Sequence, residues 1–237
     1  RLLLKYKQVS SQIFFFRQLL NKTDKIIVVS KFLKKNFGRF KTELVYNSIE
    51  NKSSKNSIKF HLNKKNYHVM MVANNFSYKN YNLFLSVIKK IQKKKIHFHI
   101  FGHDTKKLKK KLSTRDQAVT TFHGYRDNPL DFFRGHKSIL LIPSNKPETF
   151  SLIILEAFKN KILVLASKSG AHTELIKNKF NGFFIKKLNE KEIIKSLNYI
   201  MKKKNRNVLK NAYKFYNNNF KNTNFNNSIK KIINVLF

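Results

Sequence analysis

The most informative stretch of the sequence is Pro143-Ser-Asn-Lys-Pro-Glu148-Thr-Phe-Ser-Leu-Ile-Ile-Leu-Glu156-Ala157. An apolar strand candidate precedes it, and an apolar helix pattern begins inside it. Ligands of parallel α/β sheets bind outside the carboxyl ends of the strands, which is where this loop falls. We expect the helix to begin near Thr149 as its cap, which leaves the N–H groups near Phe150 and Ser151 without helical partners. These donors predict a site for a phosphate or a sugar hydroxyl.

Glu148 and Glu156 lie eight residues apart, at most roughly 12 Å along a helix axis. That reach is comparable to the span from a sugar ring to a ribose across a diphosphate, and carboxylates accept hydrogen bonds from vicinal hydroxyls. The same spacing also fits two acids on a solvated helix face. Two observations weigh against that alternative: the chain has only 12 acidic residues, and Glu156 lies among apolar neighbours, where an unpartnered carboxylate is costly.

Short apolar runs alternate with helical patterns, which predicts an α/β fold with a doubly wound parallel sheet. Six strands are expected at His68–Ala73, His97–Phe101, Val119–Phe122, Ile139–Ile142, Leu163–Ala166 and Gly182–Ile185. Helices are expected at Tyr81–Ile91, Thr105–Leu112, Pro129–Phe133, Phe150–Phe158, Ala171–Ile176 and Glu190–Met201. Upstream, strands at Lys25–Val29 and Leu44–Tyr46 flank a helix over about 30–37. The spacing of apolar residues after position 205 predicts further helices.

The net charge is strongly positive, because 50 Lys and Arg residues stand against only 12 Asp and Glu residues, giving a formal charge of +38. Such a field attracts phosphates, nucleic acids and anionic lipids. The excess is almost all Lys and is spread along the whole chain, which is also typical of an AT-rich coding bias. The sequence has no Cys, which excludes disulfides and thiolate metal sites, and no apolar run reaches the roughly 18 residues that span a bilayer.

An ordered set of motifs resembles the retaining glycosyltransferases of family four, which have the GT-B fold. Glu148-x-Phe-Ser…Glu156-Ala resembles their E-x7-E signature. Val72–Asn80 resembles V-G-R-x-x-x-x-K-G/N, and residues 170–176 resemble G-G-x-x-E-L/I. The remaining matches are Phe101-Gly102, Phe122-His-Gly124-Tyr, Asn181-Gly182, Asp24–Ser30 and Asn47–Glu50. Each motif alone is weak, but the set covers about Asp24 to Met201 in the family's order.

The resemblance implies roles for the residues at the matching positions. Glu148 would contact the donor sugar, and Glu156 would bind the ribose hydroxyls. Lys79 would neutralise the diphosphate leaving group, which stabilises the charge that develops as the glycosidic bond breaks. Retention of anomeric configuration is implied, with no protein nucleophile clearly required. The other donor-binding positions are Thr149, Phe150, Ser151, Asn74, Gly124 and Tyr125, the last two near the base.

Gly170 and Glu174 are expected behind the residues that contact the donor. Glu174 has an alternative role, as an acid at the start of its own helix, where the helix dipole favours negative charge. Histidines near the predicted strand ends are expected to be structural rather than catalytic bases; they are His103, His123 and His172.

Several positions depart from the family pattern. Asn74 stands where the family commonly has an arginine, which removes one fixed positive charge from the expected diphosphate site; Arg126 and Lys146 are candidates to replace it. Lys161 replaces a glycine after the signature helix, and the neighbouring Asn160 tolerates the left-handed conformation that helix ends often need. The sequence contains no Asp-x-Asp, so a metal-bridged diphosphate has no obvious anchor and metal independence is expected.

Four segments are expected along the chain. Residues 1–50 correspond to the residual end of an N-terminal acceptor-side domain, 51–66 to a linker, 67–203 to a nucleotide-sugar-binding Rossmann-like domain and 204–237 to C-terminal helices. A complete enzyme of this type needs a larger N-terminal domain. The chain is therefore expected to be a fragment or to work with a separate acceptor-domain chain.

Two functional hypotheses follow. The first is a retaining hexosyltransferase that moves a sugar from a nucleotide-diphosphate sugar to a glycan or lipid-linked acceptor in cell-envelope polysaccharide biosynthesis. It would be cytoplasmic and peripheral on the anionic inner face of the plasma membrane. The second is a non-catalytic protein that binds polyanions or membranes on a decayed transferase scaffold. Nucleic acid is not favoured as a partner, because the sequence has no helix-turn-helix or RNA-motif signature.

Overall fold

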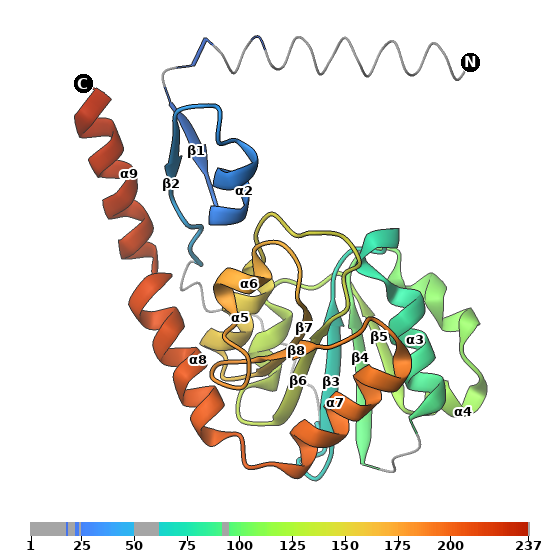
Figure 1. Ribbon diagram of the computed structural model, residues 1–237. Coiled ribbons are helices and arrows are strands. Elements are labelled where there is room, and N and C mark those ends of the chain that lie inside the picture. Colours follow the sequence, from blue (N-terminus) through green and yellow to red (C-terminus); the bar gives the residue numbers. More distant parts are fainter. Residues whose placement is uncertain (1–17, 19–21, 24, 50–61, 92–94, 237) are drawn as a thin grey trace, which may run out of the picture.

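The computed structural model describes residues 18, 22–23, 25–49, 62–91 and 95–236. Most of the predicted linker at 51–66 lies outside the described residues, as do Asp24 and Glu50 of the upstream motifs. The described chain forms a small β–α–β unit, a six-stranded α/β domain and a C-terminal pair of helices (Figure 1). The domain boundaries given above remain predictions.

Six parallel strands form the main sheet, as the alternation of apolar runs and helical patterns predicts. Each begins and ends within two residues of its expected range. Across the sheet the order is β5-β4-β3-β6-β7-β8, and all neighbouring pairs are parallel. The strands are β3 (Tyr67–Val72), β4 (Ile96–Phe101), β5 (Thr120–Gly124), β6 (Lys137–Ile142), β7 (Leu163–Ser167) and β8 (Phe183–Ile185).

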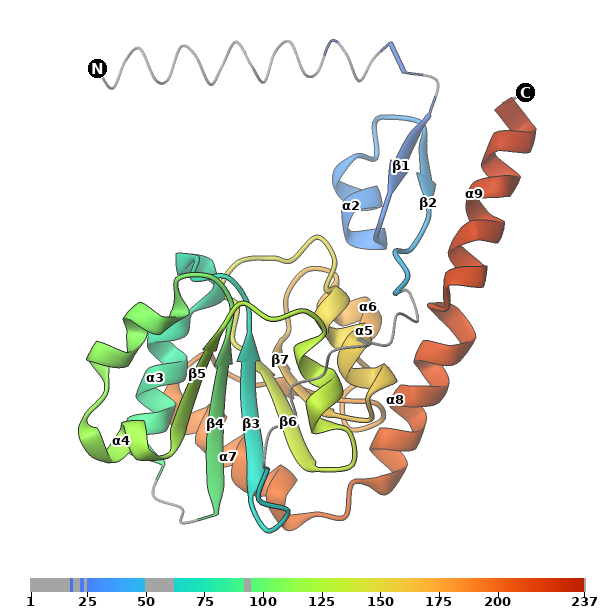
Figure 2. The ribbon, with the colours of Figure 1, turned by 180° about the vertical axis from the view of Figure 1, so that it is seen from behind.

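The strand order reverses between β3 and β6. The chain moves outward through β3, β4 and β5, and then returns to place β6 on the other side of β3 (Figure 2). Loops at the carboxyl ends of the strands diverge at such a reversal, and the crevice between them is where open α/β sheets bind ligands. The loops that carry Lys79 and Glu148 follow β3 and β6, so both start at this point.

Apolar side chains cover both faces of the sheet, because successive residues of a strand point to opposite sides. On β3, Val69 and Met71 belong to one core cluster and Met70 to the other. The first cluster includes residues of α3 (Tyr81–Lys90) and α7 (Glu190–Lys202); the second includes residues of α5 (Leu152–Lys159) and α8 (Arg206–Asn219). Burial on two faces explains why these strands read as continuous apolar runs in the sequence.

The signature helix α5 begins at Leu152, so the prediction of a start near Thr149 is wrong. Ser151 is its N-cap residue, with a non-helical backbone and no side-chain cap hydrogen bond. The carbonyl of Glu148 accepts a hydrogen bond from the Ala171 amide (2.9 Å), and the side chain of Ser151 is buried. Tertiary contacts therefore hold residues 148–151 out of the helix.

The smaller helices differ from the prediction in type. The segments predicted at 105–112 and 129–133 form 3₁₀ helices, η2 (Thr105–Lys111) and η3 (Pro129–Phe133), and η1 (Ser77–Lys79) is a third. A further helix, α4 (Thr114–Ala118), had no sequence prediction, because five residues carry no apolar period. The predicted helix at 171–176 is the short α6 (His172–Leu175).

The N-terminal unit consists of β1 (Ile26–Val28), α2 (Lys31–Asn36) and β2 (Thr42–Leu44), with the two strands parallel. The strand predicted at Leu44–Tyr46 thus lies two residues earlier. Tyr46 leaves the sheet, since its hydroxyl donates to Glu174 (3.0 Å) and its ring lies 5.4 Å from that of Phe220.

The C-terminal helices return toward this N-terminal unit. Helix α8 packs on α5, and the residues just before α9 (Asn222–Leu236) contact the segment after β2, through Tyr46–Phe220 and a bridge between Ile49 and Lys221 (Figure 1). No helix in the described part of the chain is both long and apolar enough to cross a membrane.

Candidate active site

Lys79 and Glu148 meet at the reversal of strand order. The Lys79 Nζ lies 2.6 Å from Oε1 of Glu148, and both side chains are mostly shielded from solvent. The hydroxyl of the fully buried Ser144 donates to the same carboxylate oxygen (2.7 Å). Two predicted functional residues that lie 69 positions apart are thus joined in one charged pair.

Hydrogen bonds between the two loops position this pair. The Asn145 amide donates to the carbonyl of Tyr78 (2.9 Å), and the Asn80 side chain donates to the carbonyl of Pro143 (3.2 Å). Asn80 adopts a left-handed backbone (φ 64°), a conformation that asparagine tolerates better than most residues. The loop after β3 is therefore tied on both sides of Lys79 to the loop that carries Glu148.

Gly170 lets a third loop approach the backbone of Glu148. A Cβ on Gly170 would lie 2.3 Å from the Glu148 carbonyl oxygen, and the residue has a φ of +55°. The following residue, Ala171, makes the amide hydrogen bond to that carbonyl. The predicted place of Gly170 behind the site agrees with this contact, although its role toward a donor stays a prediction.

His172 lies beside the charged pair and is fully buried. Its Nδ1 donates to the carbonyl of Ser167 (2.9 Å), which leaves Nε2 as an acceptor with no hydrogen-bond partner among the described residues. Burial lowers the pKa of His172, and the Glu148 and Lys79 charges act on it in opposite directions. A neutral imidazole at this position can accept a hydrogen bond from a ligand hydroxyl.

Glu156 lines a pocket at the carboxyl ends of β3, β4 and β5, which we call the strand-end pocket. Its volume is about 420 Å³. Burial, and then the charge of Asp131, raise the pKa of Glu156 to about 7. The full lining is Val72, Ala73, Asn74, Phe101, Gly102, Tyr125, Arg126, Asp127, Asn128, Pro129, Ile153 and Glu156.

Two more predicted residues, Asn74 and Tyr125, also line this pocket. The Oδ1 of Asn74 accepts the amide N–H of His103 (3.1 Å), and the Tyr125 ring stacks on the His103 ring at 4.5 Å. Arg126, one candidate for the missing arginine charge, is in the lining as well. Gly124 ends β5 next to the pocket, with a φ of +69°.

Thr149, Phe150 and Ser151 form the turn between Glu148 and α5. Thr149 is exposed, and the ring of Phe150 lies 6.1 Å from Tyr46 and 6.3 Å from Phe220. Because α5 begins three residues after Thr149, the N–H groups of its first turn start at Leu152. The donor-binding roles of the three residues stay predictions.

Glu174 lies in the first turn of α6, as the alternative role predicts, but its carboxylate makes hydrogen bonds to another helix. Its two carboxylate oxygens accept the amide N–H groups of Lys31 (2.8 Å) and Phe32 (2.7 Å), which open α2, together with the Tyr46 hydroxyl. The carboxylate thus also favours the dipole of α2, whose Phe32 lies 142 residues away in the chain. It joins the N-terminal unit to the loop that packs on Glu148.

Ser144 and His172 contact or neighbour the site but were not predicted as part of it. Ser144 is one of many serines in the sequence, and nothing in its spacing marks it. His172 falls inside the motif at 170–176, so its position in that motif is the signal that sequence reasoning had available. Among the described residues, no three His, Asp or Glu side chains are grouped to hold a metal ion.

The six-stranded parallel sheet with helices on both faces has the fold of an α/β domain found in GT-B glycosyltransferases. Residues 52–219 match the family described as Glycosyl transferases group 1, and the chain belongs to that family. No curated protein matches the sequence at a significant level.

Several solved structures share the fold. Sucrose-phosphate synthase from Thermosynechococcus elongatus is 16% identical, with a TM-score of 0.81 over 96% of this chain and 62% of its own. A glycosyltransferase from Rickettsia africae is 17% identical, with a TM-score of 0.72 over 89% of this chain and 62% of its own. Anabaena HepE in complex with UDP and glucose is 18% identical, with a TM-score of 0.77 over 92% of this chain and 66% of its own. The chain therefore spans less than two thirds of the length of each of these structures.

Proposed function

We propose that this chain binds a nucleotide-diphosphate sugar and forms the donor side of a retaining glycosyltransferase. The observation that supports this most directly is the Lys79–Glu148 pair at the reversal of strand order, with Glu156 in the neighbouring strand-end pocket. The pair supplies one cation and one hydrogen-bond acceptor where open α/β sheets bind ligands. The nucleotide-binding segment is assigned to residues 67–203, with the C-terminal helices at 204–237.

In this proposal Lys79 acts on the leaving group. When the bond between the anomeric carbon and the diphosphate oxygen breaks, its electron pair stays on that oxygen, and a fixed ammonium stabilises the new charge. An ammonium has three N–H donors, and the pair with Glu148 uses one of them. Glu148, held by Ser144, accepts hydrogen bonds from the donor sugar, and His172 Nε2 is a further acceptor beside it.

The strand-end pocket takes the nucleoside in this proposal. Glu156 accepts hydrogen bonds from the ribose hydroxyls, while Gly124, Tyr125 and Asn74 lie near the base. Thr149, Phe150 and Ser151 supply backbone contacts to phosphate or sugar. The Anabaena structure contains UDP and glucose, so UDP-glucose is the first donor to test.

The wider context of the reaction is also a proposal. We assign a glycan or a lipid-linked molecule as acceptor, a cytoplasmic location at an anionic membrane surface, and a hexose as the transferred sugar. Residues 1–50 are assigned to the end of an N-terminal acceptor-side domain. The rest of the acceptor side would come from that domain or from a separate chain. Metal independence stays a prediction.

Calorimetric titration with UDP-, GDP- and ADP-sugars tests the proposal. One of these donors should bind, and Glu156→Ala should weaken that binding by roughly tenfold or more, because it removes the acceptor of the ribose hydrogen bonds. Glu43→Ala, which removes an acid on β2 that is about half exposed, should leave binding unchanged. Absence of binding to all donors, or equal binding by Glu156→Ala, would contradict it.

The alternative, a polyanion-binding protein on a decayed scaffold, draws its support from Asn74 and the charge of +38. It predicts nucleic-acid or anionic-lipid binding that weakens steeply with salt, and no donor hydrolysis. Measuring hydrolysis of the donors beside a salt titration of binding to these polyanions separates the two hypotheses.

A further inference from the structure

A second pocket lies at the opposite end of α5 from the signature loop. It has a volume of about 500 Å³ and is called here the basic pocket. Four of its eight lining residues are Lys or Arg, and none is acidic. They come from the loop between η3 and β6, the C-terminal end of α5, and α8 with the residue that precedes α9; the lining is Arg134, Gly135, Lys159, Lys161, Tyr213, Tyr216, Asn217 and Lys221.

Three of the cations act on one hydroxyl in this pocket. The Lys161 ammonium lies 4.9 Å from the centre of the Tyr213 ring. A hydrogen bond from Asn217 lowers the pKa of the Tyr213 hydroxyl, and the charges of Lys161, Lys221 and Arg134 lower it further. Side chains from three separate segments therefore place positive charge around this pocket.

The guanidinium of Arg134 is held in a fixed orientation. Its Nε and Nη2 donate to Oδ1 of Asn160, at 3.1 and 2.9 Å, and Asn160 in turn donates to Asp131 (2.9 Å). A guanidinium carries five N–H donors in a planar fork, so donors remain after these two bonds. Such an ordered fork matches the geometry of a phosphate group.

Tyr216 provides a second and independent indication of a ligand. Its side chain is only 2% exposed and lines the pocket, yet its hydroxyl has no hydrogen-bond partner among the described residues. Buried hydroxyls in folded proteins are normally hydrogen-bonded, because an unpaired buried donor is costly. Tyr216 thus places an unpaired hydroxyl among the residues that line the pocket, as a donor available to a bound group.

Lysines occur over the whole surface of this chain, so their number alone identifies no site. A pocket of about 230 Å³ along β8 and α7 shows the difference. It is also lined by three lysines, but it contains the acid Glu192, and none of its side chains has an unpartnered buried polar atom. The basic pocket differs by its convergent charges, its ordered arginine and its unpartnered tyrosine.

We propose that the basic pocket binds a phosphate-bearing anion at a site separate from the sugar-donor site. Arg134 binds two phosphate oxygens, Lys161 and Lys221 neutralise the charge, and the Tyr216 hydroxyl donates to a further oxygen. A soluble diphosphate and a phospholipid headgroup carry this chemistry equally, so the experiment includes both.

Glycine signals allow the two sites to be read separately. The chain contains six glycines, so ¹⁵N-glycine labelling gives six backbone amide signals in the full protein. Gly135 lines the basic pocket, and Gly102 lines the strand-end pocket. Titration with inorganic diphosphate at about 0.15 M NaCl, where long-range attraction is screened, should shift Gly135 along a saturable one-site curve.

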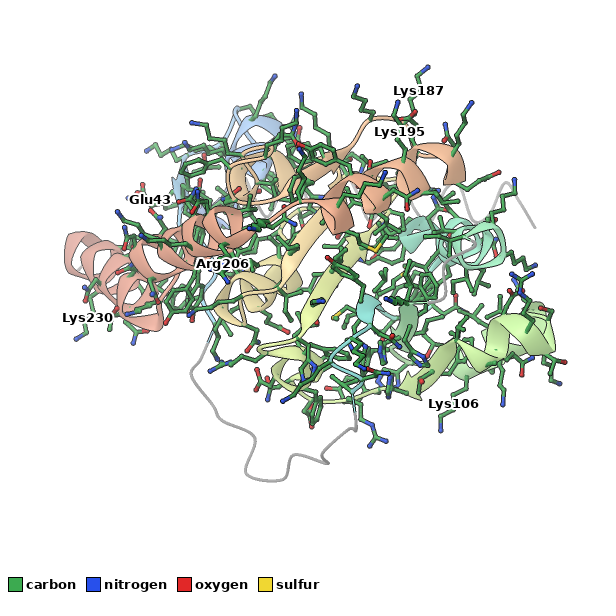
Figure 3. All side chains as sticks on the ribbon, turned by 90° about the horizontal axis from the view of Figure 1, so that it is seen from below. Glu43, Lys106, Lys187, Lys195, Arg206 and Lys230 are labelled. Atoms are coloured by element: carbon green, nitrogen blue, oxygen red, sulfur yellow. The ribbon has the colours of Figure 1, made fainter. Side chains whose placement is uncertain are left out.

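A matched pair of double variants tests the assignment. Arg134→Gln with Lys161→Gln should weaken the response of Gly135 by roughly tenfold or more. Lys187→Gln with Lys195→Gln removes the same charge from exposed surface lysines, labelled in Figure 3, and should leave it unchanged. Equal weakening in both pairs, or a Gly135 shift that sodium chloride reproduces at the same ionic strength, would overturn the proposal.

A third variant guards against loss of folding. Lys161 has a left-handed backbone (φ 54°), which glycine adopts without strain. Lys161→Gly should therefore keep or raise the melting temperature while it weakens diphosphate binding. A variant that binds diphosphate as tightly as the original chain would exclude Lys161 from the site.

Vesicles supply the second arm. The protein is sedimented with phosphatidylcholine vesicles that contain phosphatidic acid. If the Arg134–Lys161 variant loses this binding and the surface control keeps it, the basic pocket binds a phospholipid headgroup. Saturable binding of free diphosphate supports it with a soluble source. If neither probe responds specifically to the Arg134–Lys161 change, the proposal is wrong.

Discussion

The carboxyl of Glu156 has an unusual environment for an acid, since it lies on an apolar helix with Asp131 nearby. These surroundings raise its pKa to about 7 from an ordinary value of 4.5. Between these two pH values the folded state binds more protons than the unfolded state. The free energy of unfolding therefore falls as the pH rises from 4.5 through 7.

We expect Glu156→Gln to remove this pH dependence. Between pH 5 and 7 the free energy of unfolding of the variant should fall less than that of the original chain. The slopes of free energy against pH should differ by at most about 1.4 kcal/mol per pH unit. Urea unfolding at several pH values measures both slopes. Parallel curves for the two proteins would show that Glu156 does not titrate in this window.

Gly170 contributes to stability through the absence of a side chain. An alanine in the left-handed conformation costs about 1–2 kcal/mol. Gly170→Ala should lower the free energy of unfolding by more than this, because its Cβ would also lie 2.3 Å from the Glu148 carbonyl oxygen. Gly135→Ala is the matched control, since Gly135 also has a positive φ (+83°) but meets no atom within 4 Å. Equal destabilisation of the two variants in thermal melts would contradict the close contact.

Among the secondary-structure elements, α2 depends on a residue far from it in sequence. The Glu174 carboxylate accepts the N–H groups of Lys31 and Phe32, which an isolated helix leaves unpaired. Burial, followed by the hydrogen bond to Glu174, raises the pKa of the Tyr46 hydroxyl to about 12. The N-terminal unit is thus joined to the main domain by one side chain that makes three hydrogen bonds.

Glu174→Gln should loosen this connection. We expect a loss of about 1–2 kcal/mol and faster hydrogen exchange at the amides of Lys31 and Phe32, because an uncharged acceptor satisfies them less well. Glu43→Gln removes an acid in the same unit that, within the described residues, makes a weak surface contact with Lys25, and should leave these rates unchanged. Unchanged exchange in Glu174→Gln would show that the amides do not depend on its charge.

Three histidines form a chain across β3, β4 and β5. His68 bonds to His99 and His99 to His123, each at 3.0 Å, and His68 Nε2 donates to the carbonyl of Asn63 (3.1 Å). Because the Asn63 carbonyl can only accept a hydrogen bond, the proton of neutral His68 must lie on Nε2. The acceptor Nδ1 of His68 then fixes the tautomer of His99, which in the same way fixes that of His123. Burial is the main cause that lowers the pKa of His99 to about 2 and of His123 to about 4.

The histidine chain predicts sensitivity to acid. Unfolded histidines titrate near pH 6.5, so below this value the unfolded state binds more protons and stability falls as the pH drops toward 4. Each histidine contributes at most about 1.4 kcal/mol per pH unit. Urea unfolding in the Glu156→Gln background, which lacks the opposite contribution of that carboxyl, should show this loss. A flat profile between pH 6.5 and 4 would contradict the neutral buried chain.

For the whole molecule, the dominant electrostatic feature is the uncompensated positive charge. Labelled lysines such as Lys106, Lys187 and Lys230 come from distant parts of the sequence and lie around the periphery of the molecule (Figure 3). Folding brings these charges closer together, and their mutual repulsion opposes the compact state. Salt screens that repulsion, because the Debye length falls from about 30 Å at 0.01 M to about 8 Å at 0.15 M.

The melting temperature should therefore rise by several degrees between about 0.01 M and 0.15 M sodium chloride. Differential scanning calorimetry measures the change, with sodium fluoride as a second salt to separate screening from specific chloride binding. A melting temperature that falls with salt would mean that ion pairs such as Lys79–Glu148 outweigh the general repulsion.

Much of the architecture was predictable from the sequence. Apolar runs such as Ile139–Ile142 and the helical period of Tyr81–Ile91 depend on local preferences and burial, so the six strands and the larger helices lie where expected. The helix start at Leu152 was not predictable, because a contact with Ala171 helps to keep Glu148–Ser151 out of the helix. Lys161, rather than Asn160, takes the left-handed conformation at the end of that helix, which was also unexpected.

The sequence by itself determined the α/β class, the order of the loops and the identity of the charged residues on them, since motifs and periodicity are properties of short segments. Only the tertiary structure decided which distant segments meet. It paired Lys79 with Glu148, directed the Glu174 carboxylate to the first amides of α2, and gathered Arg134, Lys161 and Tyr216 around one pocket. The physical reason is that hydrogen bonds and ion pairs between separate loops depend on where packing brings the chain together, and no local pattern records that.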